Sequence, residues 1–183
     1  MVLKMGRLID GKWTETSIVT ATKNGSFDRL PRTFLDTIKK NHPKFIPETN
    51  RYHLIVSHAC PWAQRTLIYR QLKNLTDHIS VSVVHPDMLD SGWTFEADKD
   101  GATGDPLYNN QFLYQFYQQA DSDVTTSVTV PLLWDKKNET IVNNESSEII
   151  RIFNTNFNEL TGNDLDFHPK DLQKEIDELN NLI

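Results

Sequence analysis

The sequence predicts an α/β fold that contains a strand–helix–strand unit, a long link with one helix, and a β-hairpin followed by a further helix. Two short apolar runs, 52–56 and 78–84, flank a segment whose apolar residues recur at helical spacing. A second pair of apolar runs is separated by the polar turn 136–139, which is typical of a hairpin. The residues after the hairpin, 144–154, again show helical spacing.

The strand–helix–strand unit begins with the compact run YHLIV at 52–56, which is typical of a buried strand. The helix is predicted from Trp62 to about Leu75, with Pro61 in its first turn, where a missing N–H costs nothing. The alternating, β-branched run 78–84 supplies the second strand, and this order predicts a right-handed crossover. The apolar positions of the helix are Ala63, Leu67, Ile68, Leu72 and Leu75.

The long link covers residues 85–126 and is predicted to contain one helix. Asp105 and Pro106 would start this helix as N-cap and first-turn residue, and it would run to Ala120. An aromatic stripe on one face is expected to pack against the sheet rather than to bind a ligand. Its members are Tyr108, Phe112, Leu113, Phe116 and Tyr117.

The hairpin pairs an apolar strand at 127–135, interrupted by Pro131, with a short return strand at 140–143. Asn144 is the expected cap of the next helix, whose core positions are Ile149, Ile150 and Phe153. The whole order, β-α-β, a link with a helix, then β-β-α, is that of a thioredoxin-like domain, here at 49–156.

Two polar stretches flank this domain. Residues 1–48 are predicted to be an irregular N-terminal extension with one short helix near 33–40. Residues 157–183 are predicted to be a linker and an acidic amphipathic helix over 169–183, whose apolar face needs a partner surface. That face consists of Leu172, Ile176, Leu179, Leu182 and Ile183.

The composition excludes several classes of protein. A net charge of −6 and a pI near 5.5 argue against nucleic acid or a membrane as partner, because both attract basic surfaces. No apolar run approaches the roughly 20 residues that span a bilayer, and the N-terminus lacks the apolar core of a secretory signal. One cysteine cannot form an internal disulfide, which fits a reducing compartment. We therefore expect the cytosol, with a mitochondrial location as the alternative.

Cys60, the only cysteine, lies between the first strand and the first helix. The positive end of the helix dipole and the free N–H groups of the first turn stabilise a thiolate there, which makes Cys60 a candidate nucleophile. Trp62 would partly shield it, and Arg65 would add a positive charge; the alternative is a buried structural cysteine. Ala63 stands where a C-x-x-C motif has its second cysteine. A redox reaction of Cys60 would therefore need a thiol from another molecule, and glutathione is the abundant thiol of the cytosol.

Two further features, at Val130–Pro131 and at Glu145–Ser146, would suit the binding of a small molecule that carries such a thiol. A proline inside a strand loses a ladder hydrogen bond, so a cis Val130–Pro131 bond is expected, with the backbone of Val130 free to pair with an extended ligand. The alternative is an edge strand. The free N–H groups and hydroxyl at Ser146 would bind a carboxylate, and Glu145 an ammonium, as in the γ-glutamyl end of glutathione. The alternative is a plain helix start with acidic residues at its positive end.

The histidines show no metal-binding arrangement. The six of them, at 42, 53, 58, 78, 85 and 168, have no ligand spacing, so no metal is expected. His58 lies near Cys60 and leaves a Cys–His hydrolase dyad open, although no third group that would orient it is evident.

Four segments resemble the glutathionyl-hydroquinone reductases, the Xi class of glutathione transferases, which are related to the omega class. They are ACPWAQRTLI, the DSGWTF of 90–95, the stretch TVPLLWDKKNETIVNNESSEIIRIFN at 129–154, and DFHPKDLQKEID. The resemblance extends from about residue 5 to the end, and fungal members look nearest. It implies a thioredoxin-like, glutathione-binding domain and the start of an all-helical domain that is truncated here, so we expect either a fragment or a natural short form.

The resemblance also implies roles for single residues. Cys60 would be the nucleophile, with Trp93 over the glutathione. The implied glutathione contacts are Trp93, Val130, Pro131, Glu145 and Ser146, with Val130 on the cysteinyl backbone and the last two on the γ-glutamyl end. Two positions depart from the family: Gln64 stands where histidine is usual, and Ser127 where a basic residue often contacts a glutathione carboxylate.

The expected function is that of a glutathione-dependent oxidoreductase. The thiolate of Cys60 would take glutathione from an S-glutathionyl-hydroquinone, and a second glutathione would resolve the mixed disulfide. An omega-like thioltransferase or dehydroascorbate reductase is the enzyme alternative. The non-enzyme alternative is a glutathione-binding module that lacks the acceptor site. The expected partners are glutathione, glutathionylated quinol-type small molecules, and a second copy in a homo-oligomer formed through the last helix.

Overall fold

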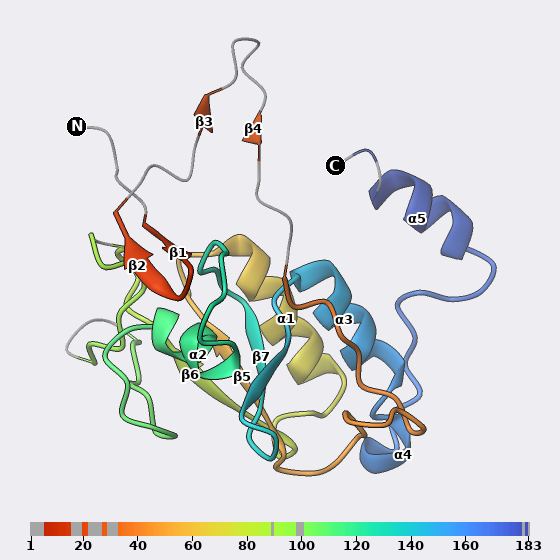
Figure 1. The fold of residues 1–183 in the computed structure, drawn as a ribbon. Coiled ribbons are helices and arrows are strands. Elements are labelled where there is room, and N and C mark those ends of the chain that lie inside the picture. The colour runs from red at the N-terminus through yellow and green to blue at the C-terminus, as the bar shows by residue number, and fades with distance from the viewer. Residues whose placement is uncertain are drawn as a thin grey trace.

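The computed structural model describes residues 6–15, 20–21, 27–28, 33–88, 90–97, 101–180 and 182. Figure 1 shows a central sheet between helices, with the N-terminal hairpins at one end and the last helix apart from the sheet.

The central sheet has four strands in the order β6-β5-β7-β8. β5 (Tyr52–Val56) is parallel to β6 (Ile79–Val83) and antiparallel to β7 (Leu132–Asp135), which pairs with β8 (Thr140–Asn143). All five residues of β5 are buried, because the strand is paired on both edges and covered on both faces. The predicted strand–helix–strand unit and the predicted hairpin are both confirmed.

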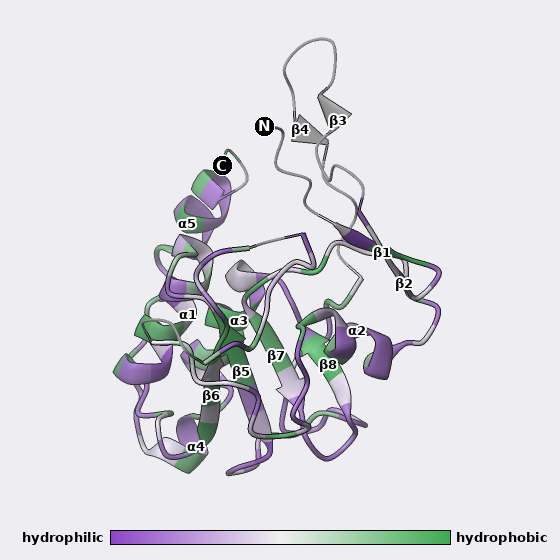
Figure 2. Ribbon diagram, turned by 90° about the vertical axis from the view of Figure 1, so that its left-hand side faces the viewer, coloured by the Kyte–Doolittle hydropathy of each residue, from purple (hydrophilic) through white to green (hydrophobic). Residues whose placement is uncertain are grey.

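Helices cover both faces of this sheet. α1 (Pro61–Leu72) connects β5 to β6 and packs against α3 (Ser146–Thr155) on one face. α2 (Tyr114–Ala120) packs beside β8 on the other face (Figure 1). In Figure 2 the hydrophobic colour concentrates on the strands between these layers. The predicted thioredoxin-like fold is confirmed.

The N-terminal residues form two short hairpins rather than an irregular extension. Their strands are β1 (Arg7–Ile9) with β2 (Lys12–Thr14), and β3 (Thr20–Ala21) with β4 (Phe27–Asp28). The first hairpin is attached to the domain, because Leu8 and Thr126 exchange backbone hydrogen bonds of 3.0 and 3.1 Å.

The predicted helix near 33–40 does not form. Leu35 makes a β-bridge with Asn143, and the N–H of Asp36 donates to the carbonyl of Val142 at 3.0 Å. The segment is extended because it covers part of the free edge of β8, which would otherwise expose unpaired backbone groups.

The start of α1 confirms the prediction, but its end and its buried face do not. The helix ends at Leu72 instead of about residue 75, because Asn74 takes a left-handed conformation with φ of 56°. Ile68 and Leu72 were predicted as core, yet they are 48% and 44% exposed, whereas Ala63 and Thr66 are fully buried. The buried face of the helix is therefore narrower than the apolar spacing indicates, and the side chains on it are smaller.

The predicted helix from Asp105 to Ala120 forms only in its last seven residues, as α2. The carboxylate of Asp105 closes a turn instead, accepting hydrogen bonds of 2.9 to 3.3 Å from the backbone N–H groups of Leu107, Tyr108 and Asn110. Asn109 has a φ of 57°, which an α-helix does not contain. The aromatic stripe still packs toward the sheet, with Phe116 and Tyr117 fully buried.

The hairpin and α3 differ from the prediction at their starts. The strand predicted at 127–135 begins only at Leu132, directly after a cis Val130–Pro131 bond of the expected isomer. α3 is capped by Glu145 rather than by Asn144, because the Glu145 side chain accepts from the N–H two residues on, at 3.4 Å. The core side of α3 is Ile149, Ile152 and Phe153, while the predicted Ile150 is half-buried.

The C-terminal part contains α4 (Asn158–Thr161) and α5 (Gln173–Asn180). α5 is shorter than the helix predicted over 169–183, of which residues 181 and 183 lie outside the described residues. The linker before α5 is held to α1 by the buried Lys73, whose ammonium donates to the carbonyl of Asn163 at 2.9 Å. Leu172 and Leu179 on the predicted apolar face are exposed.

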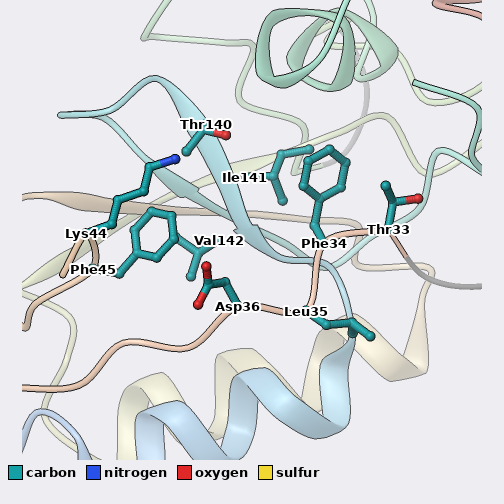
Figure 3. Close-up of a pocket in the computed structure, with 9 residues that line it drawn as sticks. All are labelled: Thr33, Phe34, Leu35, Asp36, Lys44, Phe45, Thr140, Ile141 and Val142. Atoms are coloured by element: carbon teal, nitrogen blue, oxygen red, sulfur yellow. The ribbon is translucent and has the colours of Figure 1, made fainter. Parts of the chain in front are cut away.

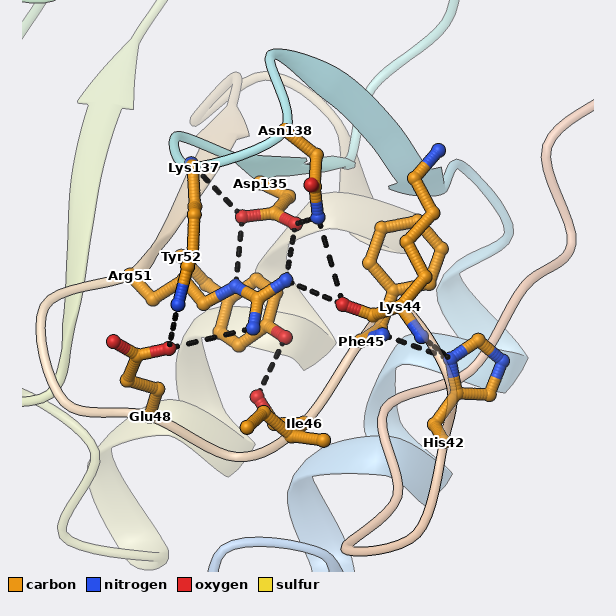
Figure 4. A network of polar contacts seen from close by, with 10 residues as sticks. All are labelled: His42, Lys44, Phe45, Ile46, Glu48, Arg51, Tyr52, Asp135, Lys137 and Asn138. Carbon is orange, nitrogen blue, oxygen red and sulfur yellow. Dashed lines mark hydrogen bonds and ion pairs between the residues drawn. The ribbon is translucent and has the colours of Figure 1, made fainter.

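A buried ion pair joins the segment before β5 to the end of β7 (Figure 4). Arg51 donates to both carboxylate oxygens of Asp135, at 2.9 and 2.7 Å, and their side chains are 4% and 0% exposed. Arg51 also donates to the carbonyl of Lys44 at 2.6 Å. Burial alone would raise the pKa of Asp135, but hydrogen bonds from Arg51, from the Lys137 backbone and from Asn138 lower it below its usual range.

Replacing Asp135 with asparagine leaves Arg51 buried without its counter-charge. We expect Asp135→Asn to lower the free energy of unfolding by about 3 kcal/mol, measured by urea denaturation at neutral pH. Glu159→Gln is the matched control, because it breaks the exposed ion pair with Lys40, which should contribute less than about 1 kcal/mol. Equal losses in the two variants would contradict a stabilising role for the buried pair.

His53 gives the fold a dependence on acid. Its ring nitrogens make hydrogen bonds of 2.7 and 2.9 Å to the hydroxyls of Ser80 and Ser82 on β6, and the ring is fully buried. Burial lowers the pKa of His53 to about 4, aided by the charge of Lys136. Between about pH 6.5 and pH 4, His53 is therefore protonated in the unfolded chain and neutral in the folded chain.

The stability that neutral His53 allows is complete above about pH 6.5 and is lost as the pH falls toward 4, by an amount on the order of 2 to 3 kcal/mol. We expect His53→Gln to flatten this part of the curve of unfolding free energy against pH. The exposed His58→Gln is the control and should keep the wild-type slope. An unchanged slope in His53→Gln would show that other groups cause the acid sensitivity.

Candidate functional site

Cys60 lies at the end of β5 and is the N-cap residue of α1. Its backbone N–H donates to the carbonyl of Ser57 at 3.1 Å, and its carbonyl accepts from the N–H of Gln64 at 3.0 Å. The side chain makes no capping bond and is half-buried. The only cysteine is therefore held by its backbone while its sulfur stays partly accessible, as a nucleophile requires.

The thiol of Cys60 points to the residue before the cis proline. Its Sγ lies 3.8 Å from the carbonyl oxygen of Val130, which comes from the segment leading into β7. Val130 and Cys60 are 70 residues apart, and the antiparallel pairing of β5 with β7 brings them together. The structure thus joins two residues that the sequence analysis proposed separately.

Arg65 reaches the start of α3, a contact that the sequence analysis did not predict. It donates through Nε and Nη2 to the hydroxyl of Ser146, at 3.1 and 2.6 Å, and its guanidinium is 3.9 Å from the carboxylate of Glu145. The physical reason is helix geometry, because five residues at about 100° each place Arg65 roughly 140° around the axis from Cys60. Burial lowers the pKa of Arg65, and the charge of Glu145 opposes this effect.

Glu145 and Ser146 therefore form a three-residue polar group with Arg65. The hydroxyl of Ser146 donates to the carboxylate of Glu145 at 3.4 Å while it accepts from Arg65. Ser146 is the first residue of α3, so this group lies at the helix N-terminus, where the N–H of Ser147 donates to the Glu145 carboxylate and the N–H of Glu148 donates to the Glu145 carbonyl at 3.1 Å. A guanidinium, a carboxylate and a helix N-terminus together suit a ligand end that carries both a carboxylate and an ammonium.

Of the two predicted tryptophans, Trp62 contacts Arg65 of this polar group. Trp62 is 47% exposed, and the guanidinium of Arg65 lies 5.0 Å from its ring centroid, so it shields Arg65. Trp93 is half-buried, and its backbone carbonyl accepts from the N–H of Leu113 at 2.9 Å.

Trp13 is a contact of this region that the sequence analysis missed. Its indole Nε1 donates to the carbonyl of Asp90 at 3.3 Å, and its ring stacks on Tyr114 at 5.0 Å. Gly92, with φ of 75°, lies directly under the ring, since a Cβ there would be 2.7 Å from it. The N-terminal hairpin thus supports the loop that carries Trp93, and no local pattern connects residues so distant in sequence.

A hollow of about 450 Å³ opens along the edge of β8 (Figure 3). Its lining residues are Thr33, Phe34, Leu35, Asp36, Lys44, Phe45, Thr140, Ile141 and Val142. The lining contains none of the candidate site residues, so the hollow is separate from the site at the helix starts.

The described residues contain no group of three or more histidine, cysteine, aspartate or glutamate residues placed to hold a metal ion. No described helix is both long and apolar enough to span a bilayer.

Comparison with known proteins identifies the relatives of this chain. The family model described as "Glutathione S-transferase, N-terminal domain" matches residues 59–156. The chain is 53% identical to the glutathionyl-hydroquinone reductase YqjG of Escherichia coli (strain K12), over 98% of this chain and 57% of that protein. It spans about half the length of the curated relatives it matches.

Solved structures show the same similarity. A Xi-class glutathione transferase from Natrialba magadii superposes with a TM-score of 0.85 and 43% identity, covering 96% of this chain and 52% of that one. The glutathione-bound structure of YqjG from Escherichia coli K-12 superposes with a TM-score of 0.83 and 50% identity, covering 96% of this chain and 54% of that one.

Proposed function

Because the chain belongs to the glutathione S-transferase family, we propose that it is a glutathione-dependent oxidoreductase that acts on S-glutathionyl-hydroquinones. The observation that carries the proposal is the position of Cys60, half-buried at a helix start with its sulfur 3.8 Å from the Val130 carbonyl. A glutathione whose sulfur is bonded to Cys60 would have its cysteinyl backbone beside that of Val130.

The reaction has two steps. In the first, the thiolate of Cys60 attacks the sulfur of the thioether, a sulfur–sulfur bond forms, and the carbon–sulfur bond breaks. The electron pair of the broken bond remains on the ring carbon, which takes up a proton, so that the hydroquinone leaves. In the second, the thiolate of another glutathione attacks the mixed disulfide, giving oxidised glutathione and restoring the Cys60 thiolate.

The start of α3 is proposed to hold the γ-glutamyl end. Its carboxylate would bind the hydroxyl and the backbone N–H of Ser146 at the helix N-terminus, and its ammonium would pair with Glu145. Arg65, already bonded to Ser146, adds a positive charge beside the same carboxylate. Trp93 is proposed to cover the glutathione, as the family resemblance implies, whereas Ser127 supplies no cation for the other carboxylate.

Two alternative functions use the same residues. An omega-like thioltransferase or dehydroascorbate reductase would form the same mixed disulfide on Cys60, and omega-like transferases are among the relatives. A glutathione-binding module without turnover is the other candidate, because the contacts at Val130, Glu145 and Ser146 concern binding alone.

The compartment, the oligomeric state and the domain bounds are also proposals. The lone cysteine fits the reducing cytosol, which we propose as the compartment. We also propose that the chain forms a homo-oligomer through two exposed leucines, Leu172 directly before α5 and Leu179 within it. The proposed glutathione domain covers residues 49–156, with 157–183 as the linker and first helix of a helical domain.

We expect Cys60→Ser to reduce hydroquinone release from an S-glutathionyl-hydroquinone by at least about a hundredfold, because serine is a far weaker nucleophile. Release is measured by liquid chromatography in the presence of glutathione. The control is the affinity of the same variant for glutathione, measured by calorimetry, which should stay close to that of the wild type.

The outcomes separate the three functions. Turnover that survives in Cys60→Ser would refute the mechanism. Wild-type chain that binds glutathione but releases no hydroquinone would support the binding module. Reduction of dehydroascorbate or of a small glutathione mixed disulfide, without hydroquinone release, would favour the omega-like activity.

A further inference from the structure

The hydroxyl of Tyr117 makes contacts that the proposed reaction does not explain. Tyr117 is fully buried in α2, and its ring packs edge-on against Phe34 with centroids 5.8 Å apart. The hydroxyl donates to the backbone carbonyl of Thr129 at 3.0 Å and accepts from the N–H of the same residue at 3.2 Å. It also accepts from the side-chain amide of Asn144 at 3.1 Å. Its one proton and two lone pairs are therefore all used.

Both partners are chain neighbours of candidate glutathione contacts. Thr129 precedes Val130, whose carbonyl faces the sulfur of Cys60. Asn144 precedes Glu145, the cap of α3. Thr129 and Asn144 both lie just outside the strands of the hairpin, since β8 ends one residue before Asn144 and β7 begins after Thr129. The sheet ladder does not extend to them, and one side chain bonds both.

We propose that the Tyr117 hydroxyl is a positioning group that sets the separation between the Val130 backbone and the start of α3. This inference rests on the proposed function, in which one glutathione contacts both places. A ligand that engages two subsites at once binds tightly only when their separation is set in advance, because otherwise ordering them costs part of the binding free energy. The Tyr117 hydroxyl bonds Thr129 and Asn144, and it acts through these two residues.

The test removes this hydroxyl and compares two measurements. One is the affinity for glutathione, which spans both subsites, and the other is the rate of a reagent that reacts with Cys60 alone. In Tyr117→Phe we expect the Kd of the full chain for glutathione, measured by calorimetry, to rise about tenfold. The rate at which iodoacetamide alkylates Cys60 should stay within about twofold of the wild type, since that reagent needs only the thiolate. Cys60 is the only cysteine, so the mass shift reports it alone.

Tyr108→Phe is the matched control. Its hydroxyl accepts a hydrogen bond from Trp134 Nε1 at 3.1 Å, so the variant also loses a tyrosine hydroxyl with a partner in the domain, but none near Val130 or α3. We expect its Kd for glutathione to match the wild type even where its melting temperature falls. A tenfold loss in Tyr117→Phe with none in Tyr108→Phe supports the positioning role.

Three results would overturn the inference. The first is a Kd in Tyr117→Phe within about twofold of the wild type, and the second is an equal loss in Tyr108→Phe, which would indicate general destabilisation. The third is a wild-type chain that does not bind glutathione, which would refute the proposed function as well. If Tyr117→Phe does not fold, Asn144→Ala replaces it; a rise of about threefold in its Kd supports the role and an unchanged Kd contradicts it.

Discussion

The double pairing of β5 is the constraint on which the rest of the structure depends. The strand is hydrogen-bonded to β6 on one edge and to β7 on the other, and all its residues are buried. A slip of one residue in either pairing would turn every side chain to the opposite face of the sheet. The end of β5 is therefore fixed in space, and with it Cys60 at the start of α1. The pairing with β7 places Val130 opposite that cysteine.

The second half of the candidate site depends on two helices that begin at the same end of the domain. α1 and α3 pack against each other, so that Arg65 of the first reaches Ser146 of the second. Behind the helix starts, the buried hydroxyl of Tyr117 bonds the residues that precede Val130 and Glu145. The site is thus assembled from three short segments, each at the boundary of a regular element, where backbone groups have no partner in a ladder or a helix.

The incorrect sequence predictions share one cause. Residues 33–40 look helical in isolation, yet they are extended because the edge of β8 offers Asp36 a backbone partner. Asp105 and Pro106 carry a helix-start signal, but the Asp105 carboxylate satisfies the N–H groups of a turn instead. Asn144 is a good cap residue whose amide is taken by Tyr117, and Glu145 caps α3 in its place. In each case a hydrogen-bond partner other than the one that the local pattern predicts competes with the local preference.

The sequence by itself determined where β5, β7 and β8 end and where α1 begins, because apolar spacing, Pro61 and Pro131 act over a few neighbouring residues. It therefore identified Cys60, Val130, Glu145 and Ser146 as candidate site residues without any knowledge of their contacts in space. Only the tertiary structure decided that Arg65 contacts the start of α3, that Trp13 contacts the loop of Trp93, and that Tyr117 bonds Asn144. These contacts join residues that are 12 to 81 positions apart. Their geometry follows from helix rotation and sheet register, which local patterns do not contain.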